Sequence, residues 1–292
     1  MKKSVRYLSL LVIGGCFLVG GKYQAAEAKD FFTISAPSIN TTAGFKENYY
    51  NLNLDLLHQY GVWEKDKAKT IEEIHEPGET DFYSLEGFQN FTNLKNFRII
   101  LSNVTDLYVF SEMKNLEKIE EFYTQIPISD LTPISNLYKL KQLNLNLGKL
   151  EDHDNYRPRE INTGKRNGVT DLTPLNSLNN LEKIEIQTQG YYPSVKLSKR
   201  DNRYELLDPI TLSKHFKTKV SYYNLIVGRE DEYDYEKFYD GGNVINSKLV
   251  WKNIPTNTDY LEFEARSDDN SSFDSPYKRY YGKHRIPIIW VD

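Results

Sequence analysis

The sequence contains a single cysteine, Cys16, and this scarcity limits both its chemistry and the sources of its stability. Cys16 lies within the first 28 residues, which have the pattern of a signal peptide, so the mature chain would hold no cysteine at all. Such a chain has no disulfide, no thiolate nucleophile and no cysteine-ligated metal. We therefore expect its stability to come from packing alone.

The sequence also lacks the motifs of the common catalytic sites. Its five histidines do not fall at the HExxH spacing, and it has neither a G-x-S-x-G nucleophile turn nor a phosphate-binding loop. The acidic stretch 151–155 begins like a calcium loop but has no glycine or terminal glutamate at the required places. For a second acidic run, 230–236, a charged surface loop is the favoured interpretation and a weak calcium site the alternative. We predict that the protein is not an enzyme and uses no cofactor or metal.

Basic residues are not in excess either. Removal of residues 1–28 takes away four of 37 basic and one of 41 acidic residues, which leaves 33 against 40 and a net charge of −7. Nucleic acid is therefore not an expected partner, because phosphate binding needs a basic face. After the signal there is no further apolar run of about 20 residues, so no membrane insertion of the mature chain is expected.

The N-terminal residues predict export. Three basic residues precede an apolar run from Leu8 to Gly21, and the small residues Ala26 and Ala28 give a signal peptidase site after Ala28. Secretion without disulfides is more typical of a Gram-positive bacterium than of a eukaryote. The alternative is a cell-envelope lipoprotein anchored through Cys16, acting in surface organisation or ligand capture. The residues after Cys16 remain apolar, which favours free secretion into the medium.

A repeated ladder of apolar residues is the main positive signal. Asp106, Asp130 and Asp171 are each followed directly by leucine, and the residues four, seven, ten and thirteen positions after each aspartate are apolar. Ser84 begins a fourth copy of this pattern. The copies start 22, 24 and 41 residues apart, and a period near 22 is typical of leucine-rich repeats. Since one coil cannot bury its own leucines, the coils are expected to stack into a solenoid.

Each coil should contribute one short parallel strand whose alternate side chains point out of the concave face. The predicted strands are Lys95–Ile100, Glu117–Phe122, Lys141–Asn146 and Glu182–Gln187. We expect function to lie on this concave face, in a chain that acts as a monomer. The candidate partner-binding residues are Asn96, Arg98, Ile100, Lys118, Glu120, Phe122, Tyr123, Gln142, Asn144, Asn146, Lys183, Glu185 and Gln187.

Phe122 and Arg98 are the expected anchors, because aromatic residues and arginine dominate protein interfaces. An alternative stays open for the second coil, in which Glu121 stands where a core leucine or isoleucine is expected. In that case the irregular coil turns Phe122 inward.

The fold class that these patterns predict is an α/β solenoid, a short leucine-rich repeat horseshoe with a cap at each end. Residues 29–80 would form an N-terminal helical cap, with helices over Phe45–Tyr60 and Asp66–His75. The repeats would occupy 81–200, with an insertion at 150–168 that forms either a plain surface loop or an extension of the binding surface.

Residues 201–292 would form an all-β immunoglobulin-like sandwich. Alternation in Lys219–Leu225, Ser247–Trp251 and Tyr260–Ala265 predicts its strands, with turn residues between them. Tyrosines are dense here and include Tyr222 and Tyr223; half-buried strand positions are the favoured interpretation and a ligand-stacking platform the alternative.

The order of these parts resembles the internalin family of Gram-positive surface and secreted proteins. The resemblance rests on Asp130–Ile134 and Asp171–Leu175 in the repeats, and on Asp240–Gly242 followed by Lys248–Trp251 and Tyr260–Phe263. It implies a secreted, non-enzymatic protein that binds a protein partner, a host or cell-surface receptor, through its concave face, and a role in virulence.

One departure from the family pattern concerns the asparagine expected at the ninth repeat position, which bonds the backbone of the next coil. That place falls at Ser102, near Thr124, at Gly148 and at Gln189. We expect the buried turn backbone to be satisfied by water, by the two hydroxyl side chains or by neighbours such as Asn103.

Overall fold

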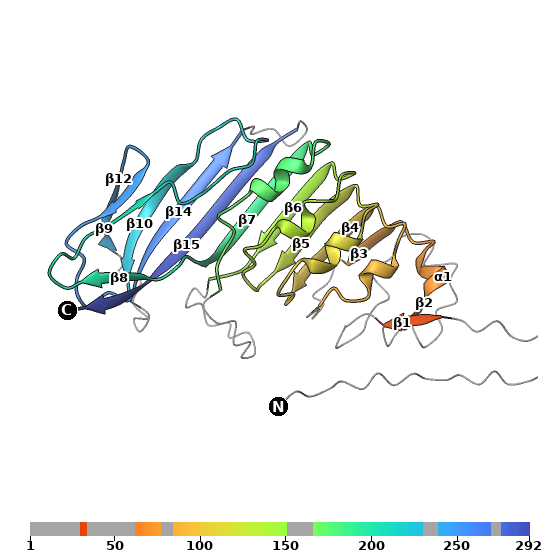
Figure 1. Cartoon of the computed structure of the whole chain (residues 1–292), viewed down its shortest axis with the longest axis horizontal. Helices are drawn as coiled ribbons and strands as arrows, with labels where there is room; N and C mark the ends of the chain where they lie inside the picture. The colour runs from red at the N-terminus through yellow and green to blue at the C-terminus, as the bar shows by residue number, and fades with distance from the viewer. Residues whose placement is uncertain (1–29, 34–61, 77–83, 151–165, 230–238, 270–275) are drawn as a thin grey trace, which may run out of the picture.

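The computed structural model describes residues 30–33, 62–76, 84–150, 166–229, 239–269 and 276–292. The predicted signal peptide, the helix predicted over Phe45–Tyr60, most of the insertion and the acidic run 230–236 lie outside these residues. Within them the protein is β-rich, with a mostly parallel sheet and few helices (Figure 1). No helix among the described residues is long and apolar enough to cross a membrane.

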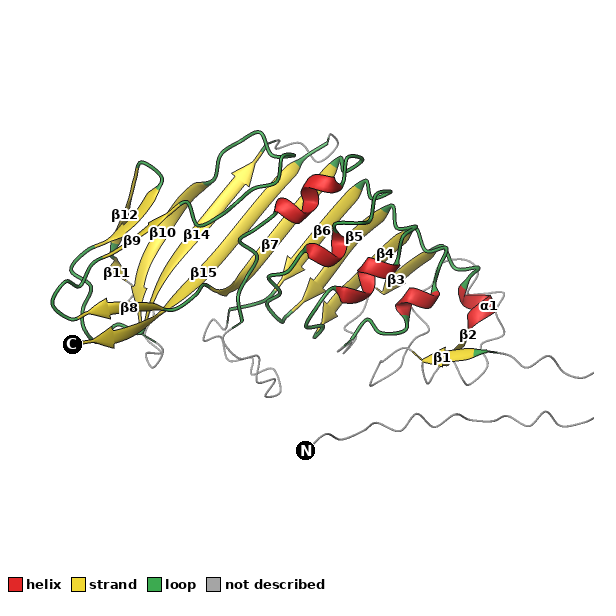
Figure 2. Ribbon diagram, in the orientation of Figure 1, coloured by secondary structure: helices red, strands yellow, loops and turns green. Residues whose placement is uncertain are grey.

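A single ten-stranded sheet runs through the repeats and on into the C-terminal part of the chain. Its strand order is β11-β10-β14-β15-β7-β6-β5-β4-β3, and β8 pairs with β15 off this path. The strands from β3 to β7 are parallel, β15 continues them in parallel, and β14 and β10 follow antiparallel. The sheet is therefore one physical unit from the first coil to the C-terminus (Figure 2).

The four predicted repeat strands are confirmed, each beginning one residue later than expected. They are β4 (Asn96–Ser102), β5 (Lys118–Thr124), β6 (Gln142–Leu147) and β7 (Lys183–Tyr191). The return path of each coil holds a short 3-10 helix instead of an α-helix: η4 (Phe88–Asn90), η5 (Tyr108–Glu112), η6 (Thr132–Ile134) and η7 (Thr173–Ser177). These helices all lie on one side of the sheet (Figure 2).

The apolar ladder fills the space between the strands and the 3-10 helices. Every apolar ladder residue in the four copies is buried, including Leu107, Leu131 and Leu172, which directly follow the repeated aspartates. In the three copies that begin with aspartate, the carboxylate accepts a hydrogen bond from the backbone N–H two residues on, which fixes the turn that enters the 3-10 helix. In each of these copies the aspartate therefore stabilises the turn, and the leucine that follows it is a core residue.

Phenylalanine replaces leucine at the N-terminal end of this core. The rings of Phe88, Phe97, Phe110 and Phe122 pack edge to face in series, with centroid separations of 5.8, 5.2 and 5.6 Å. Each such pair adds about 0.5–1.5 kcal/mol to the stabilisation from apolar burial alone. The series joins the first and second coils into one packed cluster.

Phe122 is fully buried, so its prediction as an exposed partner-binding anchor is wrong. A β-bulge is the reason: Ile119 pairs with Leu143 and Phe122 with Leu145, so β5 uses one more residue than β6 over the same length. The extra residue reverses the alternation, which leaves Glu120 and Glu121 both on the outer face. The alternative interpretation of the second coil, with Phe122 turned inward, is the one that the structure shows.

Hydroxyl groups and a glutamine take the place of the asparagine ladder. Ser102 Oγ donates to the Tyr123 carbonyl at 2.9 Å, and Thr124 Oγ1 donates to the Val104 carbonyl at 2.8 Å while it accepts from Ile126 N at 3.2 Å. In the last coil the Leu150 backbone N–H donates to Gln189 Oε1 at 3.1 Å. The prediction that Ser102 and Thr124 satisfy the turn backbone is confirmed.

At the N-terminal end, β1 (Phe31–Thr33), β2 (Val62–Glu64) and α1 (Lys65–Ala68) precede β3 (Glu73–Glu76). The helix predicted over Asp66–His75 is wrong beyond Ala68, because the last residues pair with β4 as an additional parallel strand. Trp63 packs edge to face on Phe91 at 5.5 Å, and Ile71 and Ile74 are buried beside the first coil. These side chains cover the open end of the solenoid core.

The C-terminal part contributes strands to two sheets. Four strands extend the long sheet: β10 (Ser221–Gly228), β11 (Tyr239–Asp240), β14 (Tyr260–Asp268) and β15 (Lys278–Val291). The C-terminal end of β15 also pairs with β8 (Val195–Ser198). A separate sheet contains β9 (Tyr204–Leu207), β12 (Gly242–Ile245) and β13 (Lys248–Trp251). The strands predicted within 219–225, 247–251 and 260–265 exist; the immunoglobulin-like assignment stays a prediction.

We predict that Phe122→Ala destabilises the protein by about 3–5 kcal/mol, since it removes a buried ring and leaves a cavity in the aromatic series. Chemical denaturation followed by tryptophan fluorescence would measure the change. The exposed Tyr108→Ala in the neighbouring 3-10 helix serves as the control and should change the free energy of unfolding by less than about 0.5 kcal/mol. Equal effects of the two substitutions would contradict the inward orientation of Phe122.

We further predict that Thr124→Val costs about 1–3 kcal/mol, because the isosteric side chain leaves the buried Val104 carbonyl and Ile126 N–H without their partner. Thermal unfolding would measure it. Thr124→Ser keeps the hydroxyl and should retain more of the stability than Thr124→Val. A valine variant at least as stable as the serine variant would show that the hydroxyl is not needed.

Candidate recognition face on the long sheet

The face of the long sheet opposite the 3-10 helices carries the candidate site. On β4 to β7 the alternate side chains that point away from the core are half-buried or exposed, and most of them are polar. The same face continues onto β15 and β14, because these strands belong to the same sheet. We call the outward side chains of β4, β5, β6, β7, β15 and β14 the recognition face.

One row of the recognition face crosses both parts of the chain in strict register. Tyr123 lies opposite Asn146, Asn146 opposite Gln187, Gln187 opposite Tyr281, and Tyr281 opposite Arg266. Side chains directly opposite on neighbouring strands have Cβ atoms about 4.5–5.5 Å apart, so the row is a continuous strip. It contains aromatic, amide and guanidinium groups, all of which can form directional contacts with a protein partner.

The neighbouring row is charged, and its charges are paired where β4 and β5 meet. Arg98 donates from Nε and Nη2 to Glu121 Oε2 at 3.2 and 2.9 Å. His75 Nε2, on the edge strand β3, lies 3.6 Å from Glu120 Oε2. The bulge in β5 supplies both glutamates, so the same irregularity that buries Phe122 gives this end of the face its two acidic partners.

The middle of the recognition face carries uncharged amides. Gln142, Asn144 and Asn146 are the half-buried outward residues of β6. On β7, Gln187 donates from Nε2 to Glu185 Oε1 at 3.2 Å. Amides can donate and accept at once, which makes this central region suited to the backbone or polar side chains of a partner.

The far end of the face is closed by a buried ion pair. Arg285 donates from Nε and Nη2 to Glu262 Oε2 at 3.2 and 3.0 Å, and Lys283 Nζ lies 3.5 Å from the other Glu262 oxygen. The Arg285 guanidinium also stacks 4.0 Å above the centroid of the buried Tyr260 ring. Burial alone would lower the pKa of Arg285, but Glu262 more than offsets it and raises the pKa. This end therefore fixes the sheet and is not open to a partner.

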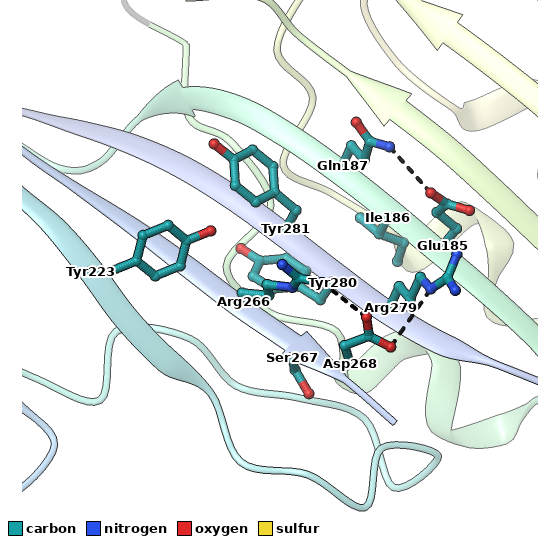
Figure 3. A pocket seen from close by; sticks show the side chains of 10 residues that line it. All are labelled: Glu185, Ile186, Gln187, Tyr223, Arg266, Ser267, Asp268, Arg279, Tyr280 and Tyr281. Carbon is teal, nitrogen blue, oxygen red and sulfur yellow. Dashed lines mark hydrogen bonds and ion pairs between the residues drawn. The ribbon is translucent and has the colours of Figure 1, made fainter. Parts of the chain in front are cut away.

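A shallow hollow of about 450 Å³ lies on β7, β15, β14 and β10, across the sheet from the amides of β6 (Figure 3). Two tyrosines, Tyr223 on β10 and Tyr281 on β15, line one side of it, and Arg279 and Asp268 line the other (Figure 3). Arg266 lies between them. Burial raises the pKa of Tyr223 and of Tyr281, and the nearby Glu264 carboxylate raises both further, so both hydroxyls stay neutral at physiological pH.

Twelve of the thirteen residues predicted for partner binding lie on the recognition face, and Phe122 alone does not. Sequence reasoning missed the residues that β14, β15 and β10 add, among them Arg266, Arg279 and Tyr281. The dense tyrosines of the C-terminal part were the one available signal. Their place on this face could not be seen from the sequence, because it depends on the pairing of β15 with β7.

That pairing is supported on the core side by a buried histidine. Tyr280 on β15 donates its hydroxyl to the Val169 carbonyl of the last coil at 2.7 Å, and its oxygen lies 3.0 Å from His284 Nε2. Since the tyrosine proton is used, His284 carries its own proton on Nε2 and donates to Tyr280. The imidazole stacks on Phe263 at 5.1 Å. Burial lowers the pKa of His284 to about 3.

The comparisons with known proteins concern solved structures alone, since no protein-family model and no curated protein matches this chain. The internalin InlF of Listeria monocytogenes is 18% identical with a TM-score of 0.33, over 50% of this chain and 42% of that one. The functional domain of InlJ from the same organism, which includes a cysteine ladder, is 15% identical with a TM-score of 0.28, over 72% and 51%.

The CBM51-2 and INT domains of ZmpB from Clostridium perfringens are 10% identical with a TM-score of 0.27, over 88% of this chain and 36% of that one. This chain thus spans about half or less of the length of these three structures. At TM-scores below 0.5 the likeness carries no assignment, so the repeat fold rests on the strand register and apolar ladder described above. Among the described residues, no group of three or more histidine, cysteine, aspartate or glutamate side chains is placed to hold a metal ion.

We predict that His284 makes the protein less stable in mild acid. The unfolded chain binds a proton near pH 6.5, whereas the folded chain binds it only near pH 3. Stability is therefore complete above pH 6.5, and the free energy of unfolding falls by roughly 1.4 kcal/mol per pH unit below it. Urea denaturation between pH 7 and pH 5 would measure the slope, above the range in which carboxylates titrate.

The control is His284→Gln, which keeps a hydrogen-bond donor and does not titrate. Its free energy of unfolding should be lower at pH 7 and should fall less steeply down to pH 5, where His215, whose pKa is also lowered by burial, still contributes. If the wild-type chain and the variant show the same dependence on pH, His284 is not the responsible group.

Proposed function

We propose that this protein binds another protein through the recognition face and does so outside the cell that makes it. The observation that carries the proposal is the in-register strip from Tyr123 to Arg266, which joins the repeats and the C-terminal strands in one exposed surface. The resemblance of the sequence to internalins supports the same kind of function, and with it a role in virulence.

The size of the face indicates a modest interface. Six adjacent strands about 4.8 Å apart span roughly 24 Å, and four outward positions along a strand span about 20 Å, or roughly 500 Å² in all. A protein interface of standard size buries about 800 Å² per partner. The partner would therefore contact most of the face at once, and a few central side chains would dominate the affinity.

The arrangement suits binding better than catalysis. Its strong charges are matched in pairs: Arg98 with Glu121, Arg279 with Asp268, and Arg285 with Glu262. Paired groups of this kind fix side-chain orientation and give specificity through the pattern of charge. We propose a recognition protein without an enzymatic activity.

Affinity capture with host-cell and bacterial-envelope extracts tests the proposal. We expect a partner that the chain retains and that Asn144→Arg loses, because Asn144 lies at the centre of the face and an arginine there adds bulk and charge. The control is Tyr138→Arg, an exposed position outside the recognition face, which should retain the partner. Both variants should unfold at the wild-type temperature. A partner that Tyr138→Arg loses and Asn144→Arg retains would place the site elsewhere.

The proposed location has its own test. Fractionation of the producing cell should place the protein in the culture medium if cleavage follows Ala28. Recovery in the membrane fraction, lost on Cys16→Ser, would instead establish the lipoprotein alternative.

A further inference from the structure

We propose that the hollow formed by Tyr223, Tyr281, Arg266, Asp268 and Arg279 takes an acidic side chain, aspartate or glutamate, of the protein partner. The proposal rests on the function proposed above and names the chemistry that one part of the recognition face selects. The hollow lies entirely on strands of the C-terminal part and of β7, outside the repeat strands β4 to β6 (Figure 3).

The strand register brings the residues of the hollow together. Arg279 lies opposite Asp268, and Tyr281 lies opposite Arg266, as successive outward pairs of β15 and β14. Tyr223 comes from the next strand, β10, where it pairs with Glu264. Three strands that are distant in sequence from the repeats therefore place two guanidinium groups and two aromatic rings around one depression.

Two carboxylates, Asp268 and Glu185, line the hollow beside the two guanidinium groups. Asp268 accepts from Arg266 Nη2 at 3.1 Å through Oδ2, and its Oδ1 lies 3.6 Å from Arg279 Nε. One carboxylate thus serves two guanidinium groups. With Glu185 the four charged side chains that line the hollow balance, so the preference for a carboxylate rests on the exposed Arg266 and not on net charge. Glu185, on the β7 side, accepts from Gln187 Nε2 at 3.2 Å.

Donors remain on Arg266. A guanidinium has five N–H groups, and the hydrogen bond to Asp268 uses one of them. The Arg266 side chain is 61% exposed, whereas that of Arg279 is 16% exposed, so Arg266 is the cation that a partner can reach. Arginine binds carboxylates through two parallel N–H···O bonds, which makes a carboxylate the matching ligand.

The two tyrosines, Tyr223 and Tyr281, add to the preference for an acidic side chain. Their rings provide flat apolar walls for the methylene carbons of an aspartate or glutamate side chain. Both hydroxyls are protonated near neutral pH, so neither carries a negative charge that would repel the ligand. Glu264 is a further carboxylate beside the hollow: it pairs with Tyr223, accepts a hydrogen bond from the Tyr281 hydroxyl and lies opposite Lys283 in the strand register.

Continuity with the rest of the face identifies the occupant as a protein. The strip Tyr123–Asn146–Gln187–Tyr281 runs without a break from the repeats to Arg266, so a chain laid across the amide region reaches the hollow at its end. A partner segment with one acidic residue beyond its repeat-binding part satisfies both regions at once.

The test uses the full chain and a phage-displayed library of dodecapeptides as the probe. Enriched peptides are synthesised with a fluorophore, and their dissociation constants are measured by fluorescence anisotropy. We expect the enriched peptides to contain an aspartate or glutamate, and Arg266→Glu to weaken their binding at least tenfold. Replacement of the peptide's acidic residue by lysine should restore binding to Arg266→Glu within a few fold.

The matched control is Arg200→Glu, the same charge reversal at an exposed turn outside the face, and it should leave every dissociation constant unchanged. Peptides that depend on Asn144 but not on Arg266 would overturn the assignment of the hollow and leave the proposed function intact. Enrichment of no peptide, or only of peptides without an acidic residue, overturns the assignment as well. An anionic glycan that binds in an Arg266-dependent way when no peptide does would overturn both proposals.

Discussion

The parallel pairing of β15 with β7 is the constraint on which the rest of the structure depends. Eight residue pairs, from Lys278 with Ile184 to Arg285 with Tyr191, join the last strand of the chain to the last repeat strand. This pairing removes the edge that the solenoid would otherwise expose, and an unpaired edge strand is a site of aggregation. It also aligns the outward side chains of both parts, so the recognition face exists only because this register is kept.

Buried polar groups make the junction between β15 and β7 sensitive to substitution. His284, Tyr280 and the Val169 carbonyl form a hydrogen-bonded series on the core side, while Glu262 and Arg285 form an ion pair on the other side. Removal of one member leaves a buried group without a partner, which costs more than the net contribution of the bond. The junction is therefore rigid, and a rigid support lowers the entropic cost of binding for the side chains that it positions.

The bulge in β5 changes which side chains this strand presents on the recognition face. One additional residue moves Phe122 into the aromatic series and brings Glu120 and Glu121 outward together. On the repeats, the face therefore lacks the Phe122 ring and instead carries two glutamates that pair with His75 and Arg98. The exposed guanidinium of Arg266 and the half-buried rings of Tyr223 and Tyr281 lie toward the C-terminal strands, while Tyr123 is the half-buried aromatic residue that β5 adds to the face. Under the proposed function, both parts of the chain would therefore contribute to specificity.

The sequence by itself determined the repeat architecture. The apolar ladder after each aspartate predicts which residues are buried and where each repeat strand begins. Because each coil must pack against its neighbours, every copy has apolar residues at the same positions. Eleven of the thirteen proposed face residues follow from the same alternation, whereas Phe122 is buried and Tyr123 faces outward because of the bulge in β5. Strand propensity likewise indicated the strands near Ser221, Lys248 and Tyr260.

Only the tertiary structure decided the orientation of Phe122, the strand at Glu73–Glu76 and the union of the repeats with the C-terminal sheet. A bulge depends on the register between two strands, and register is a property of neither strand alone. The pairing of β15 with β7 joins residues nearly a hundred positions apart, and no local pattern of side chains encodes such a contact. The hollow around Arg266 follows from that pairing, so the sequence supplies its residues and the fold supplies their arrangement.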